Sequence, residues 1–202
     1  MGSRRTSVVR RSRALGVPLS PKAARVMDRR PTRPGQHGRA RVRMSDYKVR
    51  LLEKQRLRAQ YGLRERQLRA AVGRAARRPE PTGEALLVDL ETRLDALVLR
   101  AGLARSTAQA RQAVSHGHIR VDGRKVDRPS YRVAPGQVIE VAERSRGMLP
   151  FQAAAAGEYA ERVPPYLDVD REALRARLER LPERREIPVR CDEIKVVEFY
   201  AR

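Results

Sequence analysis

The stretch that decides the fold is RLDALVLRAGLARSTAQARQAVSHGHIRVDGRKV at residues 93–126, followed by SYRVAPGQVIEV at 130–141. Apolar residues recur at helical spacing in its first part, and Gly102 is expected to end this helix. Ser106 predicts the start of a second helix, and Gln109, three residues further on, completes a capping-box pattern. The first half of the stretch therefore predicts two short helices.

A hairpin and a further strand follow these helices. Ile119 and Val121 alternate with polar residues as in a half-buried strand, and Asp122-Gly123 is a strong signal for a two-residue turn. Another alternating strand is predicted at 138–141. Residues 93–141 are thus expected to form a helix-helix-hairpin module with a polar, partly basic ridge.

The charge of the chain is strongly positive and unevenly distributed. Its 45 Lys and Arg residues oppose 24 Asp and Glu residues, which gives a formal net charge of +21. Residues 1–43 carry a net charge of +12, residues 44–78 a net charge of +8, and the remainder only +1. Self-repulsion would oppose compaction of the N-terminal part without a polyanion, so a nucleic-acid partner is predicted.

A membrane partner has less support than a nucleic acid. No apolar run approaches the roughly 20 residues of a bilayer span, and the first residues lack the apolar core of a secretory signal. The Arg- and Ser-rich N-terminus leaves an organellar transit peptide as an alternative. A single cysteine, Cys191, allows no internal disulfide and suits a reducing compartment, so we expect a cytoplasmic protein without membrane contact.

Residues 1–43 combine many arginines with several prolines and glycines and show little periodicity. Such a segment buries too little apolar surface to fold alone, so we predict an extended arm that its partner orders. Within it, RPGQHG at 33–38 indicates a rigid turn whose glycines permit close backbone approach. We interpret Gly35, Gln36 and His37 as a contact loop, with a plain linker as the alternative.

Residues 44–78 predict a pair of basic helices. Ser45 can cap a helix that continues to Gly62, and a second helix runs from Leu63 until Pro79 ends it. This segment carries 11 Lys or Arg residues against three acidic ones, whereas a solvated face normally mixes the two signs. We therefore favour phosphate contact over a solvated helix pair.

Further elements are predicted around the module. A third helix with Thr82 as its N-cap carries a four-leucine stripe from Leu86 to Leu97, which runs directly into the module. The boundary near residue 91 is therefore expected to be a packed junction. The C-terminal part predicts a helix at 151–161, a strand at 166–169, a helix at 171–181, and either a helix or a strand at 192–200.

Four blocks of sequence match one known family in the same order. They are PGQHG at 34–38, SDYKVRLLEKQRLRAQYGLRERQLR at 45–69, the RLD…ARSTAQARQAVSHGHIRVDGR module, and VVEFYAR at 196–202. Together they resemble the bacterial small-subunit ribosomal protein four, the S-four family, from about Pro34 to the end of the chain. The helical block makes the match specific, because many RNA-handling proteins share the module alone.

This resemblance implies an α+β fold: a helical domain, an RNA-binding α-L module (helix-helix-hairpin) on a small antiparallel sheet, and an extended basic N-terminal arm. We expect the arm at 1–43, the helical domain at 44–91 with 190–202 returning to it, and the RNA-binding sheet domain at 92–189. The return of the C-terminal segment favours the helix over the strand for residues 192–200.

The resemblance also implies a structural constituent of the small ribosomal subunit. The family binds the ribosomal RNA of that subunit early in assembly, at a junction of helices in the 5′ domain, and nucleates the body of the subunit. The expected neighbours are ribosomal proteins five and three, together with messenger RNA at the channel through which it enters. An influence on translational accuracy is implied by that position.

Many members of the family hold a zinc ion or an iron-sulfur cluster through cysteines in the arm. Residues 1–43 contain no cysteine here, and His37 is their only histidine. A tetrahedral zinc site usually needs four such ligands, so the chain resembles a metal-free version of the family. No metal and no cofactor are expected.

RNA contact requires cationic groups for phosphates and polar groups that meet the 2′-hydroxyl. The candidate RNA-binding residues of the loop, the basic helices and the module are Gly35, Gln36, His37, Tyr47, Arg50, Lys54, Arg56, Arg58, Arg66, Arg69, Arg93, Arg105, Ser106, Arg111, Gln112, Ser115, His116, Arg120 and Lys125. The candidates from Arg93 to Arg120 are expected to form one continuous surface. Alternatively, Arg93 could pair with a local carboxylate and Ser106 could serve only as a helix cap. With two Phe and no Trp, recognition is expected to rely on RNA shape and backbone rather than on base stacking.

Two other functions fit parts of this pattern. Pseudouridine synthases use the same module and an Arg-Leu-Asp triplet, which Arg93-Leu94-Asp95 matches, so an RNA-modifying enzyme or another RNA-binding protein is the alternative. Against the enzyme, the triplet lies inside the first helix of the module, and the chain has no room for a further catalytic domain. A general DNA binder would account for the charge but not for the capped helix pair and hairpin.

Overall fold

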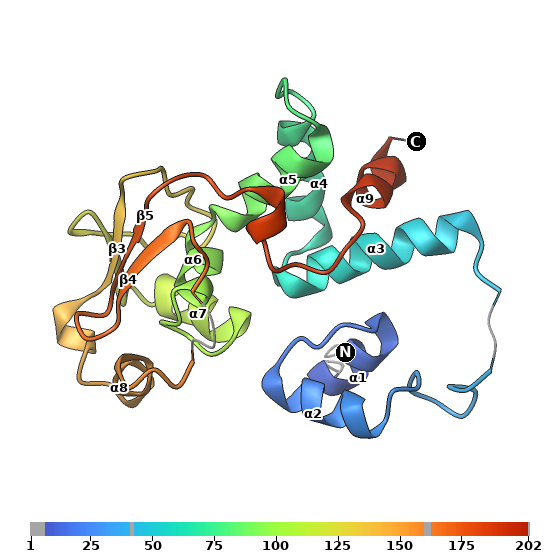
Figure 1. Cartoon of the computed structure of the whole chain (residues 1–202), viewed down its shortest axis with the longest axis horizontal. Coiled ribbons are helices and arrows are strands. Elements are labelled where there is room, and N and C mark those ends of the chain that lie inside the picture. The colour runs from blue at the N-terminus through green and yellow to red at the C-terminus, as the bar shows by residue number, and fades with distance from the viewer. Residues whose placement is uncertain (1–6, 41–42, 160–162, 202) are drawn as a thin grey trace, which may run out of the picture. The chain divides into compact units, whose positions relative to one another are not determined.

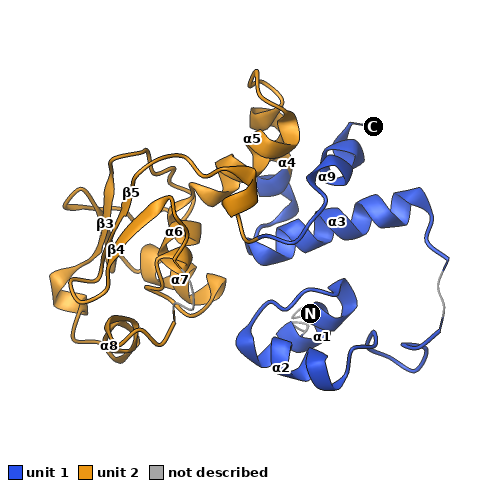
Figure 2. Cartoon of the chain, in the orientation of Figure 1, with its two compact units in different colours: residues 1–68, 189–202 blue, residues 69–188 orange. Residues whose placement is uncertain are grey.

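The computed structural model describes residues 7–40, 43–159 and 163–201 of the chain. Within them, a run of helices precedes a small antiparallel sheet, as Figure 1 shows. This is an α+β fold, as predicted. The chain divides into two compact units, which have separate colours in Figure 2.

Unit 1 comprises residues 1–68 and 189–202, and unit 2 comprises residues 69–188. The sequence predicts a boundary near residue 91, whereas the structure assigns residues 69–91 to the sheet-bearing unit. Side-chain contacts explain the difference. The carboxylate of Asp89, for example, accepts hydrogen bonds at 2.8 Å from Arg132, which follows the hairpin.

The N-terminal arm is not wholly extended, which corrects the prediction for residues 1–43. It contains α1 (Val8–Leu15) and α2 (Pro21–Arg29). Gly16 ends α1 in the left-handed conformation at φ 69°, and the Ser20 hydroxyl caps α2 by accepting a hydrogen bond from a backbone N–H of its first turn. Both helices therefore begin or end at residues that suit those positions.

Polar contacts hold the arm together where apolar surface is scarce. The fully buried Ser12 hydroxyl donates to the Val8 carbonyl at 2.9 Å and accepts from the Leu19 N–H at 3.1 Å. The Arg13 guanidinium reaches across to the Thr32 carbonyl at 3.1 Å. Hydrophobic periodicity does not register such contacts, which is why the sequence predicted no helices here.

Two further helices belong to unit 1. The Ser45 hydroxyl caps α3 (Asp46–Gln60), as predicted, and the Asp192 carboxylate caps α9 (Glu193–Tyr200). The C-terminal segment thus forms a helix rather than a strand. This helix, α9, packs on α3, as Figure 1 shows. α4 (Glu65–Ala75) begins in unit 1 and continues into unit 2.

Unit 2 contains the predicted module. Its helices and strands are α6 (Leu94–Arg100), α7 (Thr107–Ser115), β1 (Ile119–Val121), β2 (Arg124–Lys125) and β3 (Val138–Val141). Asp122 and Gly123 have φ angles of 47° and 75°, as a two-residue hairpin turn with both central residues at positive φ requires. The helix-helix-hairpin prediction is confirmed.

α5 (Thr82–Glu91) differs from its prediction in two respects. Thr82 is its first helical residue, while Pro81 occupies the N-cap position without a side-chain hydrogen bond. The helix also ends at Glu91, and the hydroxyl of the C-cap residue Thr92 donates back to the Val88 carbonyl at 2.9 Å. The four-leucine stripe is therefore shared between two helices, α5 and α6.

The remaining strands are β4 (Leu167–Asp170) and β5 (Arg175–Leu178). All five strands pair antiparallel in the order β2-β1-β3-β5-β4. The helix predicted at 171–181 is wrong. Its leucines do have helical spacing, but the side chains of β5 alternate between exposed and buried, as a half-buried strand requires.

One face of the sheet packs against α6, α7 and α8 (Leu149–Ala155) to form the core of unit 2. α8 is shorter than the predicted helix at 151–161, whose last two residues lie outside the described residues. The opposite face is charged, and the register aligns one cross-strand row of Lys125, Arg120, Glu140, Arg175 and Asp170. We call this the open sheet face. Two short 3-10 helices, Glu143–Ser145 and Arg184–Glu186, lie in the connections.

Candidate nucleic-acid interface

The outer side of α7 presents polar side chains that suit phosphates and hydroxyl groups. Arg105, Gln112, Ser115 and His116 are exposed, whereas the apolar side of the helix is buried in the core. Ser106 is half-buried, and its hydroxyl caps α7 by accepting a hydrogen bond from the N–H three residues further on. These five predicted residues lie together, and we call them the α7 face.

The start of α7 is held by a variant of the predicted capping box. The side-chain oxygen of Gln109 accepts a hydrogen bond from the Arg105 N–H at 2.9 Å, one residue earlier than the box requires. The backbone N–H groups of Arg105 and Gln109 are therefore both hydrogen-bonded to side chains at the start of the helix. The backbone of Arg105 is thereby fixed just before the helix, which positions this residue on the α7 face.

Arg111 is only partly available on this helix. Its side chain is 33% exposed, and its Nη1 atom lies 3.9 Å from a carboxylate oxygen of Asp95. A ligand could therefore reach part of the guanidinium while the rest faces the carboxylate.

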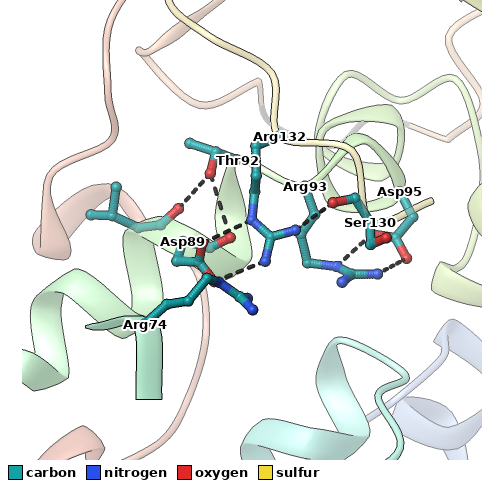
Figure 3. A network of polar contacts seen from close by, with 8 residues as sticks. Arg74, Asp89, Thr92, Arg93, Asp95, Ser130 and Arg132 are labelled. Atoms are coloured by element: carbon teal, nitrogen blue, oxygen red, sulfur yellow. Dashed lines mark hydrogen bonds and ion pairs between the residues drawn. The ribbon is translucent and has the colours of Figure 1, made fainter. Parts of the chain in front are cut away.

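Arg93 is not available to RNA, which corrects its prediction as a contact residue. Its side chain is 3% exposed, and its Nε and Nη2 atoms donate to both oxygens of Asp95 at 2.8 and 2.6 Å (Figure 3). This two-point contact neutralises both charges inside the fold. The local ion pair is the correct interpretation, and it also buries the aspartate of the Arg-Leu-Asp triplet.

Asp89 and Glu91, two other buried carboxylates of unit 2, also pair with arginines. Asp89 lies between Arg74 and Arg132, and both arginines donate to it at 2.8 Å (Figure 3). Burial alone would raise the pKa of the Asp89 carboxyl, but the hydrogen bonds from these arginines hold its pKa below the ordinary value. The fully buried Glu91 pairs with Arg100. These arginines serve the fold, so the formal charge of +21 exceeds the charge available to a ligand.

Arg120 does not share the α7 face. Ile119 and Val121 are buried in the core, so the intervening Arg120 points toward the open sheet face. There it pairs in register with Glu140 and Lys125. The predicted continuous surface from the helix to this strand is therefore wrong.

Three predicted arginines of α3 have partners inside unit 1. Arg50 pairs with a carboxylate of α9 at 2.6 Å, Arg56 donates to the last carbonyl of α1 at 2.7 Å, and Arg58 pairs with Glu65 at 3.1 Å. Their side chains are 24%, 33% and 27% exposed. These arginines hold neighbouring helices and still expose part of each guanidinium.

Lys54 is buried, which removes it from the predicted RNA-binding set. It is 6% exposed, and its ammonium lies 3.0 Å from a Glu65 oxygen and 4.2 Å from the centroid of the Phe199 ring. The Tyr200 hydroxyl donates to the same Glu65 oxygen at 2.6 Å. The ammonium therefore stabilises the packing of α9 on α3.

This cluster predicts a pH dependence of the stability of unit 1. Burial would raise the pKa of the Glu65 carboxyl, but hydrogen bonds from Tyr200 and Lys54 lower it below its ordinary value of 4.5. A carboxyl with a lowered pKa stabilises the fold above its unfolded pKa, and this contribution is lost as the pH falls through the folded pKa. Glu65→Gln is therefore expected to destabilise the protein at pH 7, with a difference from wild type that shrinks below about pH 4.

Urea unfolding of both proteins at pH 7, 5, 4 and 3 checks this expectation. Glu172→Gln, an exposed glutamate between β4 and β5 that lies in no helix, is the matched control and should leave the unfolding midpoint unchanged. A wild-type advantage over Glu65→Gln that stays constant down to pH 3 would contradict the role of the Glu65 charge.

The other candidates of unit 1 and α4 are exposed. Tyr47, Arg66 and Arg69 lie on helix surfaces, and Gln36 and His37 lie in the predicted contact loop. The glycines of this loop have the expected special conformations. Gly35 has φ 108°, and a Cβ added at Gly38 would lie 2.0 Å from a backbone carbonyl oxygen.

Sequence reasoning missed two groups of exposed residues. It named no individual arginine of the arm, yet Arg10 is exposed on α1, Arg25 and Arg29 are exposed on α2, and Arg39 is exposed in the turn of the predicted contact loop. The net charge of the arm was the signal for them. It also missed Met148, a 43% exposed apolar side chain near the α7 face, for which the pattern held no signal.

Two negative findings apply to the described residues. They contain no group of three or more His, Cys, Asp or Glu side chains placed to hold a metal ion. No helix among them has the length and apolar character needed to cross a membrane.

Two family models match consecutive parts of the chain. The S4 domain model matches residues 92–139, which contain the α7 face, and the model of the ribosomal protein S4/S9 N-terminal domain matches residues 3–91. The fold and the polar helix face thus belong to an S4-domain protein of the ribosomal type.

Curated relatives extend this similarity over the whole chain. The small ribosomal subunit protein uS4 of Bifidobacterium animalis subsp. lactis is 59% identical over 100% of both chains. The proteins of the same name from Bifidobacterium adolescentis and Streptomyces griseus are 61% and 58% identical, over 96% of this chain and 95% and 96% of theirs. The chain belongs to the uS4 family of small ribosomal subunit proteins. The family resemblance is confirmed, and the enzyme alternative falls because these relatives are ribosomal proteins.

Proposed function

We propose that this chain binds small-subunit ribosomal RNA at the helix junction of the 5′ domain early in assembly, and so nucleates the body of the subunit. The α7 face carries the proposal, because it joins exposed cationic and hydrogen-bonding groups on a helix that contains no acidic residue. Paired RNA is recognised largely through phosphates and 2′-hydroxyls, which such groups can contact.

Binding has two components in this proposal. The exposed cations of unit 1 and α4 attract the RNA at long range, and the α7 face then docks against its backbone. The proposed contact residues are Gly35, Gln36, His37, Tyr47, Arg50, Arg56, Arg58, Arg66, Arg69, Arg105, Ser106, Arg111, Gln112, Ser115, His116, Arg120 and Lys125. If about 6–10 phosphates are neutralised, affinity falls about 10³–10⁵-fold between 50 and 200 mM salt.

We also propose ribosomal proteins five and three, and messenger RNA at its entrance channel, as neighbours of this chain in the cytoplasmic ribosome, where it influences translational accuracy. The family relationship supports these neighbours. The part of the open sheet face formed by Glu140, Arg175 and Asp170 adds support for a protein neighbour, because its alternating charges suit a protein surface better than a polyanion. Co-sedimentation with small subunits, followed by crosslink mapping, tests each neighbour directly.

Arg105→Glu is expected to weaken binding to the 5′ domain RNA about 10-fold or more, because it replaces a cation of the α7 face with an anion. Filter binding of a transcribed 5′ domain fragment measures the effect. Arg105 is a better site than Arg111, where a glutamate would also repel the buried Asp95. Arg185→Glu is the control, because this side chain is 82% exposed and lies beside Glu183. Equal affinities of the two variants would rule out the α7 face.

A further inference from the structure

A groove runs beside the α7 face within unit 2. One side is formed by α7 along its length, and the other by Met148, Pro150 and Phe151 at the start of α8. Its volume is about 420 Å³, which lies within the range of about 300–1,000 Å³ typical of small-ligand sites. Arg105, Ser106, Gln112 and His116 line it, so the groove opens directly onto the α7 face.

The side contributed by α8 is apolar. Met148 is 43% exposed, Pro150 lies beside it, and Phe151 closes the wall from the core. Leu103 and Ala113 add buried apolar surface. A phosphate gains no binding free energy from an apolar wall. A flat ring that covers the wall removes apolar surface from water, which is favourable.

The side formed by α7 and its flanking residues supplies cationic and hydrogen-bonding groups but no anionic group. The ionisable groups that line the groove are Arg105, His116 and His118, and none of the described lining residues carries a carboxylate. The exposed Gln112 amide offers both donors and an acceptor, the combination that reads the edge of a base. The lining therefore complements a ligand that joins an anionic group to a planar ring with polar edges.

His118, the half-buried histidine of the groove, suits contact with the ring of such a ligand. Its Nδ1 atom lies 2.9 Å from the Ser145 hydroxyl, and its ring meets Phe151 edge-on at 6.0 Å between centroids. Burial, and then the charges of His116 and Arg144, lower the pKa of His118. The lowered pKa favours the neutral imidazole, whose flat ring can pack against the ring of a base.

We propose that the groove receives the base of one unpaired RNA nucleotide, whose phosphate contacts Arg105. The inference rests on the proposed function and adds a second mode of contact to it. Unpaired bases can be splayed out and stacked on protein side chains, whereas bases inside an A-form helix cannot enter such a site. The junction bound by the α7 face would thus be recognised partly through a base that does not pair.

Filling the groove tests this directly. Ala108 is exposed on α7 and lines the groove, so Ala108→Phe places a ring in it without removing any polar contact. Binding to a transcribed 5′ domain RNA is expected to weaken about 10-fold, since stacking of one base contributes on the order of 5–150-fold. The salt slope should stay unchanged, because no cation is lost. Ala156→Phe, at an exposed position outside the groove, is the control.

Base-specific chemical probing of the complexes supplies the second readout. An unpaired base protected by the wild-type protein should become reactive with Ala108→Phe and stay protected with Ala156→Phe. Met148→Ala should give a weaker form of the same change, and Leu149→Ala, whose residue does not line the groove, should give none.

Identical affinities and reactivities for both Phe variants would overturn the groove assignment while leaving RNA binding intact. Failure of the wild-type protein to bind the RNA would overturn the proposed function itself. Loss of a neighbouring protein from reconstituted subunits, with unchanged RNA reactivities, would assign the groove to a peptide and also refute the inference.

Discussion

Asp95→Ala is expected to destabilise unit 2 by about 3–5 kcal/mol, because it leaves the Arg93 guanidinium charged and unpaired inside the fold. The side chains of both residues are almost fully buried, and the two hydrogen bonds between them satisfy groups that water cannot reach. In the folded protein, the attraction between the two charges offsets the free-energy cost of removing them from water. Without Asp95, the buried Arg93 charge still bears its desolvation cost and has no partner to offset it. Urea unfolding followed by circular dichroism measures the loss.

Two further variants separate the pair from a general effect of losing a carboxylate. Asp168→Ala removes an exposed carboxylate of β4 and should change stability by less than about 0.5 kcal/mol. The double variant Arg93→Leu/Asp95→Leu should be more stable than Asp95→Ala, because it leaves no unpaired charge. If the double variant is less stable than Asp95→Ala, the unpaired charge of Arg93 cannot be the cause of the destabilisation, and this explanation is wrong.

Replacing four of the exposed arm arginines, Arg10, Arg25, Arg29 and Arg39, with glutamine is expected to have the largest effect on RNA affinity. Asp28 is the only acidic residue in residues 1–43, so little internal charge offsets these cations. Each phosphate contact contributes about 0.7–0.9 to the slope of log affinity against log salt, so the slope should fall by about 3. Substitution leaves the backbone contacts of α1 and α2 in place, which deletion of the arm would not.

The matched control removes the same charge from unit 2. Arg175, Arg177, Arg180 and Arg185 all have nearby carboxylates, at 2.5 Å for Arg180 and Glu186 and at 2.8 Å for Arg185 and Glu183. Changing these four to glutamine should alter the slope by less than about 1. Filter binding over a range of salt concentrations compares the two variants. Equal slopes would mean that total charge, rather than the arm, drives capture.

Local signals explain which parts of the fold the sequence could predict. The module depends on residues whose conformation is set by their own chemistry, such as Gly117 at φ 72° after α7 and the Asp122-Gly123 turn. Ser45 and Ser106 likewise cap their helices through bonds within four residues. Such features need no knowledge of distant partners, so pattern and composition were sufficient.

Features that depend on distant partners were the ones predicted incorrectly. Lys54 has the same chemistry as a phosphate-binding lysine, but Glu65 and two aromatic rings of α9 surround it in the fold. Arg120 lies on the open sheet face because Ile119 and Val121 point into the core, and its partners there follow from strand register, which the chain order alone does not specify. Around β5, Leu174, Leu178 and Leu181 have helical spacing, but residues 175–178 alternate between exposed and buried side chains and form a strand. The α7 face was predictable because one helix carries all of it.

The buried carboxylates also limit how this sequence can change over time. Arg93 and Asp95 are both almost fully buried, so a change at either position leaves an unpaired charge at the other, whereas Asp89 keeps one arginine if Arg74 or Arg132 changes. Substitutions of Arg93 and Asp95 are therefore expected to be tolerated better together than singly. A chain rich in interchangeable surface arginines thus contains a few whose identity depends on one specific acidic partner.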